Sequence, residues 1–249
     1  MGRALVTGAS SGLGLEMARA LDAKGHEVAI VARSEAALVE LAASMDRPTI
    51  VVADLGTPEG RRAVTEAVAE ADIVINNAGF GEYGQFAQIP EERSVSMVEL
   101  NCEAVVSLTR SYLPGMLERR SGRIMNIAST AAFQPGPTMA VYYASKAFVL
   151  SFTEAVAEEV RGTGVTVTAF CPGAFASGFQ DEAKVAETRL VKGRKLPTSA
   201  ELAAAGLKAM ESGTVVAVPG LSNKVGASST RFMPRSAMRR IVRYIQAEA

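Results

Sequence analysis

A tyrosine and a lysine four residues apart are the clearest candidates for chemistry in this sequence. Tyr142 and Lys146 lie in a segment of helical composition that runs to Val160, so we expect both side chains on one face of a helix. A tyrosine is protonated at neutral pH, and a nearby cation makes its phenolate accessible. The pair can therefore exchange a proton with a reacting oxygen. Ser129, placed at the end of a predicted strand, can hydrogen-bond the same oxygen.

A glycine-rich turn near the start of the chain indicates a binding site for a phosphate-containing ligand. The run TGASSGLG, from Thr7 to Gly14, follows a predicted strand and precedes a helical pattern. Glycines in such a turn let the backbone approach a pyrophosphate, which the N-terminus of the following helix stabilises. The spacing G-x-x-x-G-x-G differs from the G-x-G-x-x-G fingerprint, so an ordinary glycine turn stays open as an alternative. The residues expected around a dinucleotide are Gly8, Ser10, Ser11, Gly12, Leu13 and Gly14.

Short β-branched runs alternate with longer segments of helical period along the chain. Because these runs are apolar on both faces and separated by helices, they predict a doubly wound parallel seven-stranded sheet, an α/β Rossmann fold. No linker or repeat divides residues 1–249, so we expect a single domain. Helix starts are expected at Ser34, Thr57 and Ser199, and a helix stop at Gly25. The expected strands are Ala4–Thr7, Val28–Ala32, Thr49–Ala53, Ile73–Asn76, Arg123–Ala128, Val165–Phe170 and Val215–Val218.

Composition excludes several classes of function. Lys and Arg balance Asp and Glu at 26 each, so no positive field directs the chain to nucleic acid. The cysteines, Cys102 and Cys171, lack the spacing of a metal site and are expected as reduced core residues, and the single histidine, His26, cannot build a metal site or a triad. No apolar run approaches the ~20 residues of a membrane span, and no signal-peptide core is present. We therefore expect a cytoplasmic protein without a metal.

The motifs, taken in order, resemble those of the short-chain dehydrogenase/reductase family over roughly residues 3 to 180. Thr7 to Gly14 matches its T-G-x-x-x-G-x-G turn, and Asn76-Asn77-Ala78-Gly79 matches its N-N-A-G turn. The resemblance implies an oxidoreductase that moves a hydride between a nicotinamide and a carbonyl or alcohol carbon. Its four catalytic positions are occupied by Asn101, Ser129, Tyr142 and Lys146.

The resemblance also assigns roles around the cofactor. Lys146 would hold the nicotinamide ribose as well as acting on Tyr142, and the backbone near Asn101 would carry a water that relays protons from Lys146. Ser177 stands where the family has threonine, and Phe175 where Val or Ile is usual, so the nicotinamide pocket is altered there. The further residues implied at the cofactor are Asp54 and Leu55 at the adenine, Asn77, Ala78 and Gly79 beside the sheet, and Pro172 and Gly173.

The end of the second strand predicts which phosphate form is bound. An acidic side chain there would bond the ribose hydroxyl of NAD and repel the 2′-phosphate of NADP. The chain has Ala32-Arg33-Ser34 instead. Arginine offers a forked, permanently charged donor for phosphate, and we expect Ser34 to add a hydroxyl or a helix-start amide at the cofactor. A solvated Arg33 is the alternative, and Glu35 is interpreted as a first-turn helix charge. We expect NADP(H) to be preferred over NAD(H).

Two segments after the catalytic motifs are expected near the substrate. Residues 174–197 carry mixed charge and weak periodicity, and in similar enzymes this segment forms a substrate lid. Arginines share a helical pattern with apolar residues from Arg231 to Arg243, which suits packing against the domain or a second subunit, or a membrane surface. An apolar substrate is expected from Phe133, Met139, Phe175 and Phe179.

The expected activity is the interconversion of a ketone or aldehyde and an alcohol, with Tyr142 as general acid and base. Several of the candidate catalytic residues, taken singly, also have a structural interpretation. Ser129 can belong to a turn at the end of a strand, Asn101 can be a polar group in the helical stretch Ser94–Ser111, and Tyr142 can be a half-buried aromatic. A noncatalytic NADP-binding regulator of the same fold is the alternative from another class, and an epimerase or dehydratase is the enzymatic one. The helices expected over Ser94–Arg119 and Tyr142–Arg161 favour a homodimer or homotetramer by resemblance.

Overall fold

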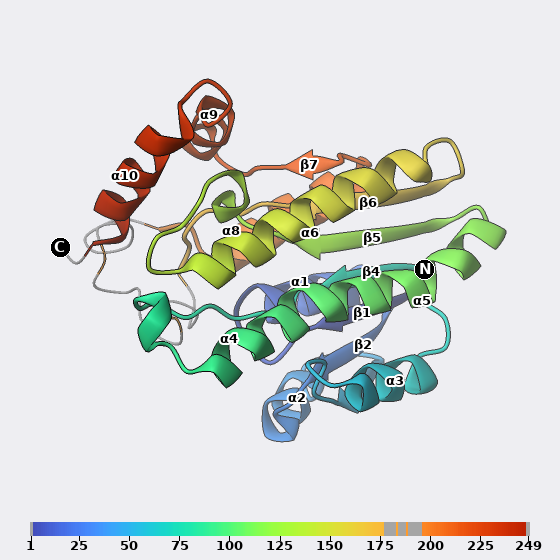
Figure 1. Cartoon of the computed structure of the whole chain (residues 1–249). Coiled ribbons are helices and arrows are strands. Elements are labelled where there is room, and N and C mark those ends of the chain that lie inside the picture. The colour runs from blue at the N-terminus through green and yellow to red at the C-terminus, as the bar shows by residue number, and fades with distance from the viewer. Residues whose placement is uncertain (1, 177–182, 184–187, 189–195, 248–249) are drawn as a thin grey trace.

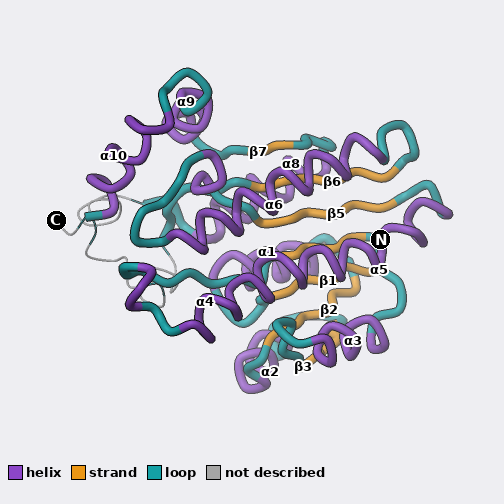
Figure 2. The backbone as a smooth tube through the Cα atoms, in the orientation of Figure 1, coloured by secondary structure: helices purple, strands orange, loops and turns teal. Residues whose placement is uncertain are grey.

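A parallel β-sheet forms the centre of the computed structural model (Figures 1 and 2). The structure describes residues 2–176, 183, 188 and 196–247, and within them the strand order is β3-β2-β1-β4-β5-β6-β7. This confirms the doubly wound α/β fold in a single domain, with strand ends at most one residue from those expected. The strands are β1 Arg3–Thr7, β2 Glu27–Ala32, β3 Pro48–Val52, β4 Ile73–Asn76, β5 Gly122–Ile127, β6 Val165–Phe170 and β7 Val216–Ala217.

Helices cover both faces of the sheet (Figure 1). Helices α1, α2 and α8 pack against one face, and α3, α5 and α6 against the other. The α-helices are α1 Gly12–Ala23, α2 Glu35–Ala42, α3 Pro58–Ala67, α4 Glu91–Val98, α5 Ala104–Glu118, α6 Ala140–Glu159, α8 Ser199–Glu211, α9 Leu221–Ser229 and α10 Arg235–Gln246. Short 3-10 turns lie at Phe86–Gln88 and Thr130–Phe133.

Strand residues alternate between two hydrophobic cores. Ala4 and Val6 of β1 pack with α1 and α8, whereas Leu5 between them packs with α5, and all three are fully buried. Side chains of a strand point to opposite faces in turn, so a strand covered by helices on both sides needs apolar residues throughout. This is why the strand runs in the sequence are continuously apolar rather than alternating.

Side-chain caps account for most of the expected helix starts. The Ser34 hydroxyl accepts a hydrogen bond from Ala37 N at 3.4 Å, and the Thr57 hydroxyl accepts one from Gly60 N at 3.0 Å. Helix α8 begins at Ser199, where a start was expected, but its side-chain cap is the preceding residue, Thr198, which completes a capping box with Glu201.

The helix expected across Ser94–Ser111 is not regular. A wider π-helical turn, Glu99–Glu103, separates α4 from α5 and contains Asn101. Such turns insert one residue into a helix and are frequent at functional sites. The periodicity of the sequence does not reveal this turn, because its apolar residues still face the core on both sides of it.

The helix expected over Arg231–Arg243 was also wrong in extent. Pro234 separates α9 from α10, since proline lacks the N–H that a continuous helix would need there. Met238 and Val242 of α10 are buried against the domain, while the arginines of this segment are exposed. Among the described residues, no helix has the length and apolar character needed to cross a membrane.

A ladder of buried polar side chains connects the sheet to two helices. Asn76 Nδ2 on β4 donates to Asn126 Oδ1 on β5 at 2.8 Å and to Thr109 Oγ1 on α5 at 3.2 Å. Asn126 Nδ2 in turn donates to Thr153 Oγ1 on α6 at 3.0 Å. Buried amides are costly unless bonded, so these contacts specify how α5 and α6 sit on the strands.

We expect Asn126→Leu to lower the free energy of unfolding by about 1–3 kcal/mol, because its neighbours would lose hydrogen bonds inside the core. Thr168→Val is the matched control, since the buried Thr168 hydroxyl has no hydrogen-bond partner among the described residues and valine keeps its shape. The control should be neutral or stabilising. Urea unfolding followed by circular dichroism measures both variants, and equal destabilisation by the two would contradict the role of the ladder.

Candidate active site

A cavity of about 380 Å³ opens at the carboxyl ends of the strands. Its walls come from the segments that follow β1, β2, β3, β4, β5 and β6, and from the start of α6. Ligands of open parallel sheets bind at this edge, where the strand order reverses between β1 and β4. The expected site residues that line it are Gly8, Ser10, Ser11, Gly12, Leu13, Arg33, Asp54, Leu55, Asn77, Ala78, Gly79, Ser129, Tyr142, Lys146, Pro172, Gly173 and Phe175.

The glycine turn presents the N-terminus of α1 to this cavity. Gly8 and Gly12 have φ angles of 65° and 56°, in the left-handed region that favours glycine. Ser11 is the N-cap of α1, but its side chain makes no capping hydrogen bond, in contrast to the caps of α2 and α3. The first N–H groups of α1 are therefore not satisfied by a side-chain cap, and they suit the phosphates of a dinucleotide.

Gly14 has a packing role behind this turn and does not line the cavity. A Cβ atom at this position would lie 2.4 Å from both Asn77 Nδ2 and Gly8 O, closer than any real contact. The glycine is therefore needed for the close approach of α1 to the turn after β4. This differs from the cofactor contact expected from its place in the motif.

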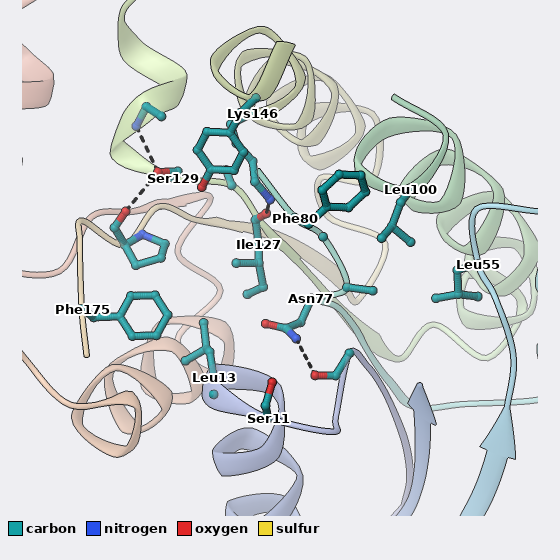
Figure 3. Close-up of a pocket in the computed structure, with 18 of the residues that line it drawn as sticks. Ser11, Leu13, Leu55, Asn77, Phe80, Leu100, Ile127, Ser129, Lys146 and Phe175 are labelled. Atoms are coloured by element: carbon teal, nitrogen blue, oxygen red, sulfur yellow. Dashed lines mark hydrogen bonds between the residues drawn. The ribbon is translucent and has the colours of Figure 1, made fainter. Parts of the chain in front are cut away.

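Thr7 and Asn77 join the two loops that diverge from the sheet. Thr7 Oγ1 accepts hydrogen bonds from the backbone N–H groups of Asn77 and Ala78 at 2.9 and 3.0 Å. Asn77 Nδ2 donates back to Thr7 O at 2.9 Å and to Gly8 O at 3.2 Å. Figure 3 shows Asn77 between the cavity and the glycine turn. The sequence motif alone assigns no role to Thr7, and the structure gives it this positioning role.

Arg33 is exposed at the end of β2 and lines the cavity beside Asp54 and Leu55. Ser34 does not line it, because its hydroxyl caps α2, and Glu35 occupies the first turn of that helix. Asp54 Oδ1 accepts a hydrogen bond from Gly56 N at 2.9 Å, which holds the loop after β3. This end of the cavity therefore carries both a cationic side chain, Arg33, and a carboxylate, Asp54.

Ser129, Tyr142 and Lys146 meet at the other end of the cavity. Figure 3 shows Ser129 and Lys146 there, on the opposite side of the site from Leu55. Lys146 Nζ donates to Ile127 O at 2.8 Å and lies 5.8 Å from the centre of the Tyr142 ring. Ser129 hydrogen-bonds the Tyr142 side chain, and its hydroxyl also accepts a bond from Ala131 N at 3.1 Å. A single helix, α6, thus presents both ionisable groups beside the Ser129 hydroxyl.

Burial is the main cause of the pKa shifts of Tyr142 and Lys146. Loss of water raises the pKa of Tyr142 to about 12, although the hydrogen bond from Ser129 acts in the opposite direction. Burial lowers the pKa of Lys146 to about 8. The lysine was expected to make the tyrosinate accessible, but desolvation of the Tyr142 hydroxyl is the largest influence on its pKa. Tyr142 therefore holds its proton firmly at neutral pH.

Asn101 lies behind the cavity wall in the π-helical turn. Its Oδ1 accepts a hydrogen bond from Phe80 N at 3.1 Å, and its Nδ2 donates to Phe80 O at 2.9 Å and to Ser145 Oγ at 3.0 Å. A Cβ on Gly79 would lie 2.8 Å from Asn101 Oδ1, so glycine is required at this approach. Asn101 thus connects the loop after β4 to α6, next to Lys146.

Two expected features fall largely outside the described residues. Ser177 and Phe179 lie outside them, as does most of the lid expected at 174–197. The ends of this segment meet, since Ala176 N donates to Pro197 O at 2.9 Å. Cys102 and Cys171 are buried free thiols, as expected.

Sequence reasoning missed several cavity residues. Met139 was expected only as a substrate contact, and Tyr143, which also lines the cavity, was not assigned a role. Gln246 of α10 was not considered, although it lines the cavity and bonds the Tyr143 hydroxyl. No local signal could have found it, because its partner is 103 residues away in the chain. Phe133, expected near the substrate, instead packs into a core cluster with Val149 and Leu150.

Comparison with known proteins agrees with this arrangement. The family model for short chain dehydrogenases matches residues 3–188. A putative ketoacyl reductase of Streptomyces coelicolor is 41% identical over 181 residues, covering 68% of this chain and 69% of that protein. The ketoacyl reductase HetN of Nostoc sp. is 33% identical over 238 residues, covering 92% and 82%.

A solved structure extends the similarity to the whole fold. The short-chain dehydrogenase from Sphingobium yanoikuyae in complex with NADPH superposes with a TM-score of 0.84 at 30% identity, covering 93% of this chain and 94% of that one. The family model spans well over half of the chain, and the glycine turn, the Asn77 turn and the Tyr142–Lys146 pair converge on one cavity. The chain therefore belongs to the short-chain dehydrogenase/reductase family.

Proposed function

We propose that this oxidoreductase interconverts a ketone or aldehyde and an alcohol with NADP(H), using Tyr142 as the general acid and base. One observation carries the proposal: Ser129, Tyr142 and Lys146 share a single cavity with the glycine turn and Arg33. The cavity thus combines a proton donor with a cradle suited to a dinucleotide. The names of two relatives, both ketoacyl reductases, support a carbonyl substrate.

The protonated Tyr142 acts as the acid in the reductive direction. When bound, NADPH supplies the hydride that adds to the carbonyl carbon. Tyr142 then gives its proton to the oxygen on which negative charge develops, and Ser129 stabilises that charge by a hydrogen bond. Because burial raises the pKa of Tyr142 to about 12, the residue carries the proton that the reductive direction requires at neutral pH.

Lys146 supports a catalytic rather than a structural interpretation of the site. It is 6% exposed and forms no ion pair with a carboxylate among the described residues; its Nζ bonds only a backbone carbonyl. A buried cation without a counter-ion costs stability, so packing alone would favour an apolar residue here. Its place beside Tyr142 suits a role in holding the nicotinamide ribose and moving protons.

Arg33 and the absence of an acid at Ala32 support NADP(H) over NAD(H). The arginine lies where the loop after β2 meets the cavity, and it forms no ion pair within the part of the chain that the structure describes. It is therefore available to a 2′-phosphate. The NADPH complex of the Sphingobium yanoikuyae neighbour supports the same preference.

The substrate end favours a mainly apolar molecule. Met139, Ala131 and Phe175 line the cavity beside the catalytic residues, and their surfaces are apolar.

We further propose a cytoplasmic homodimer or homotetramer, as for similar enzymes. The activity is tested by NADPH consumption with a panel of ketones and aldehydes; binding of NADPH without turnover of any of them would favour the noncatalytic alternative.

Tyr142→Phe should lower kcat by at least ~10²-fold while NADPH binding is largely kept, because the change removes only the proton donor. Tyr143→Phe, the adjacent comparison, should cost less than ~10-fold with a ketone that has no second hydroxyl, since the Tyr143 hydroxyl bonds Gln246 whereas Ser129 hydrogen-bonds Tyr142. Steady-state kinetics with the best ketone of the panel provide the measurement. Inactive Tyr143→Phe beside active Tyr142→Phe would overturn the assignment.

Arg33→Ala should weaken NADPH binding by about 1.5–3 kcal/mol, the scale of a charge-assisted hydrogen bond, and change NADH binding little. Fluorescence titration of both cofactors measures the two losses. Arg47→Ala, which removes an exposed arginine that bonds Glu27 far from the cavity, is the control and should alter neither affinity. An equal loss for the two cofactors in Arg33→Ala would refute a contact with the 2′-phosphate.

The pH dependence of stability should differ between the wild type and Lys146→Met. The pKa of Lys146 is about 8 in the fold against an ordinary value of 10.5, so the unfolded chain binds this proton more tightly. The cost of the buried charge, roughly 3 kcal/mol, is present below pH 8 and vanishes as pH rises towards 10.5. Wild-type stability should therefore rise relative to the variant across this range. Urea unfolding of both proteins at several pH values tests this, and a constant difference would contradict it.

A further inference from the structure

Helix α10 brings one polar side chain into the substrate end of the cavity. Met238, Val242 and Gln246 are spaced by four residues and form the buried stripe of this helix. The first two pack with Ala131 and Met139 in an apolar cluster. Gln246 continues the stripe but lines the cavity, at 1% exposure. Figure 1 shows α10 at the same end of the sheet as the start of α6. An amide thus occupies a position where packing alone would favour an apolar residue.

The amide of Gln246 is only half satisfied. Its Nε2 donates a hydrogen bond to the Tyr143 hydroxyl, whereas its Oε1 is buried without any hydrogen-bond partner among the described residues. A buried acceptor left unpaired destabilises the fold, and native proteins rarely keep one without a reason. Because this orphaned oxygen belongs to a residue that lines the cavity, a ligand that donates a hydrogen bond would satisfy it.

Tyr143 holds the amide next to the catalytic tyrosine. A Cβ on Gly136 would lie 2.2 Å from the Tyr143 ring, so this glycine allows the backbone to press against the ring and limit its movement. The rings of Tyr142 and Tyr143 meet edge to face, with centroids 6.1 Å apart. The Tyr143 oxygen accepts from Gln246, which leaves its own proton available to an acceptor. The pair therefore offers one acceptor and one donor in the wall of the cavity that Tyr142 also lines.

We propose that Gln246 and Tyr143 form a polar subsite that binds a hydroxyl group of the substrate, separate from the carbonyl that is reduced. A hydroxyl can donate to Gln246 Oε1 and accept from the Tyr143 hydroxyl at once, which matches the two open positions. The inference rests on the proposed reductase function and refines its substrate class to an apolar ketone with a second oxygen. Gln246 acts here as a specificity-determining residue.

The test uses the full chain with NADPH and aryl ketones that carry a hydroxyl at each ring position. Each is paired with an analogue that has a methyl group instead, so that size is kept and the donor is lost. For at least one position, wild-type kcat/KM should favour the hydroxyl compound by about 10-fold or more. Gln246→Leu should bring that ratio close to one, and Tyr143→Phe should reduce it.

Met238→Ala is the control for a merely structural role of α10. It loosens the same buried stripe without removing a polar atom, so it should leave the hydroxyl-to-methyl ratio as in the wild type. The proposal is overturned if the wild type prefers no hydroxyl position, or if Gln246→Leu retains the wild-type ratio.

A separate readout distinguishes failure of the subsite from failure of the reductase function. If no ketone consumes NADPH, the same compound pairs are compared by the thermal shift that they produce in the NADPH-bound protein. Stabilisation by a hydroxyl compound that is lost in Gln246→Leu would support the subsite and contradict the reductase proposal. Equal shifts in the wild type and the variant would overturn the subsite itself.

Discussion

The hydrogen bonds between Thr7 and the turn after β4 are the constraint on which the rest of the site depends. At this point the strand order reverses, so the loops after β1 and β4 lead away from each other and leave a cavity between them. The Thr7 hydroxyl accepts from two backbone N–H groups of the second loop, and Asn77 bonds the backbone of the first. The glycine turn and the Gly79 segment are thereby held at a fixed separation on either side of the cavity.

Polar contacts continue from this point to the ionisable groups. The loop after β4 reaches Asn101 through Phe80, and Asn101 reaches α6 through Ser145, next to Lys146. Each step buries polar atoms, and Lys146 also brings a charge without a counter-ion among the described residues. Such groups cost stability unless their geometry is maintained. The two hydrophobic cores that cover the sheet offset this cost, since they bury the strands on both faces.

The two ends of the cavity are built in different ways. The dinucleotide end consists of turns that directly follow strands, so each residue is placed by its own strand end and a local cap or glycine. The other end is closed by segments from distant parts of the chain, including α10, which packs on the domain through Met238 and Val242 and bonds Tyr143 through Gln246. Loops on a rigid scaffold tolerate change more readily than strand ends. Related enzymes that catalyse the same reaction can therefore differ in their substrates through changes at this end of the cavity.

The sequence by itself determined the parallel sheet, its strand ends to within one residue, the glycine turn and the pairing of Tyr142 with Lys146, because each depends on local periodicity or on spacing along one helix. Only the tertiary structure decided the rest. In the structure, a π-helical turn lies around Asn101 where a regular helix was expected, and Gly14 packs behind the glycine turn. The last helical segment is interrupted at Pro234. Gln246 also contacts Tyr143 in the structure. The two residues are 103 positions apart in the chain, so no local sequence pattern predicts this contact. Burial is likewise a property of the whole fold, so the raised pKa of Tyr142 and the lowered pKa of Lys146 followed from packing rather than from the spacing of the two residues.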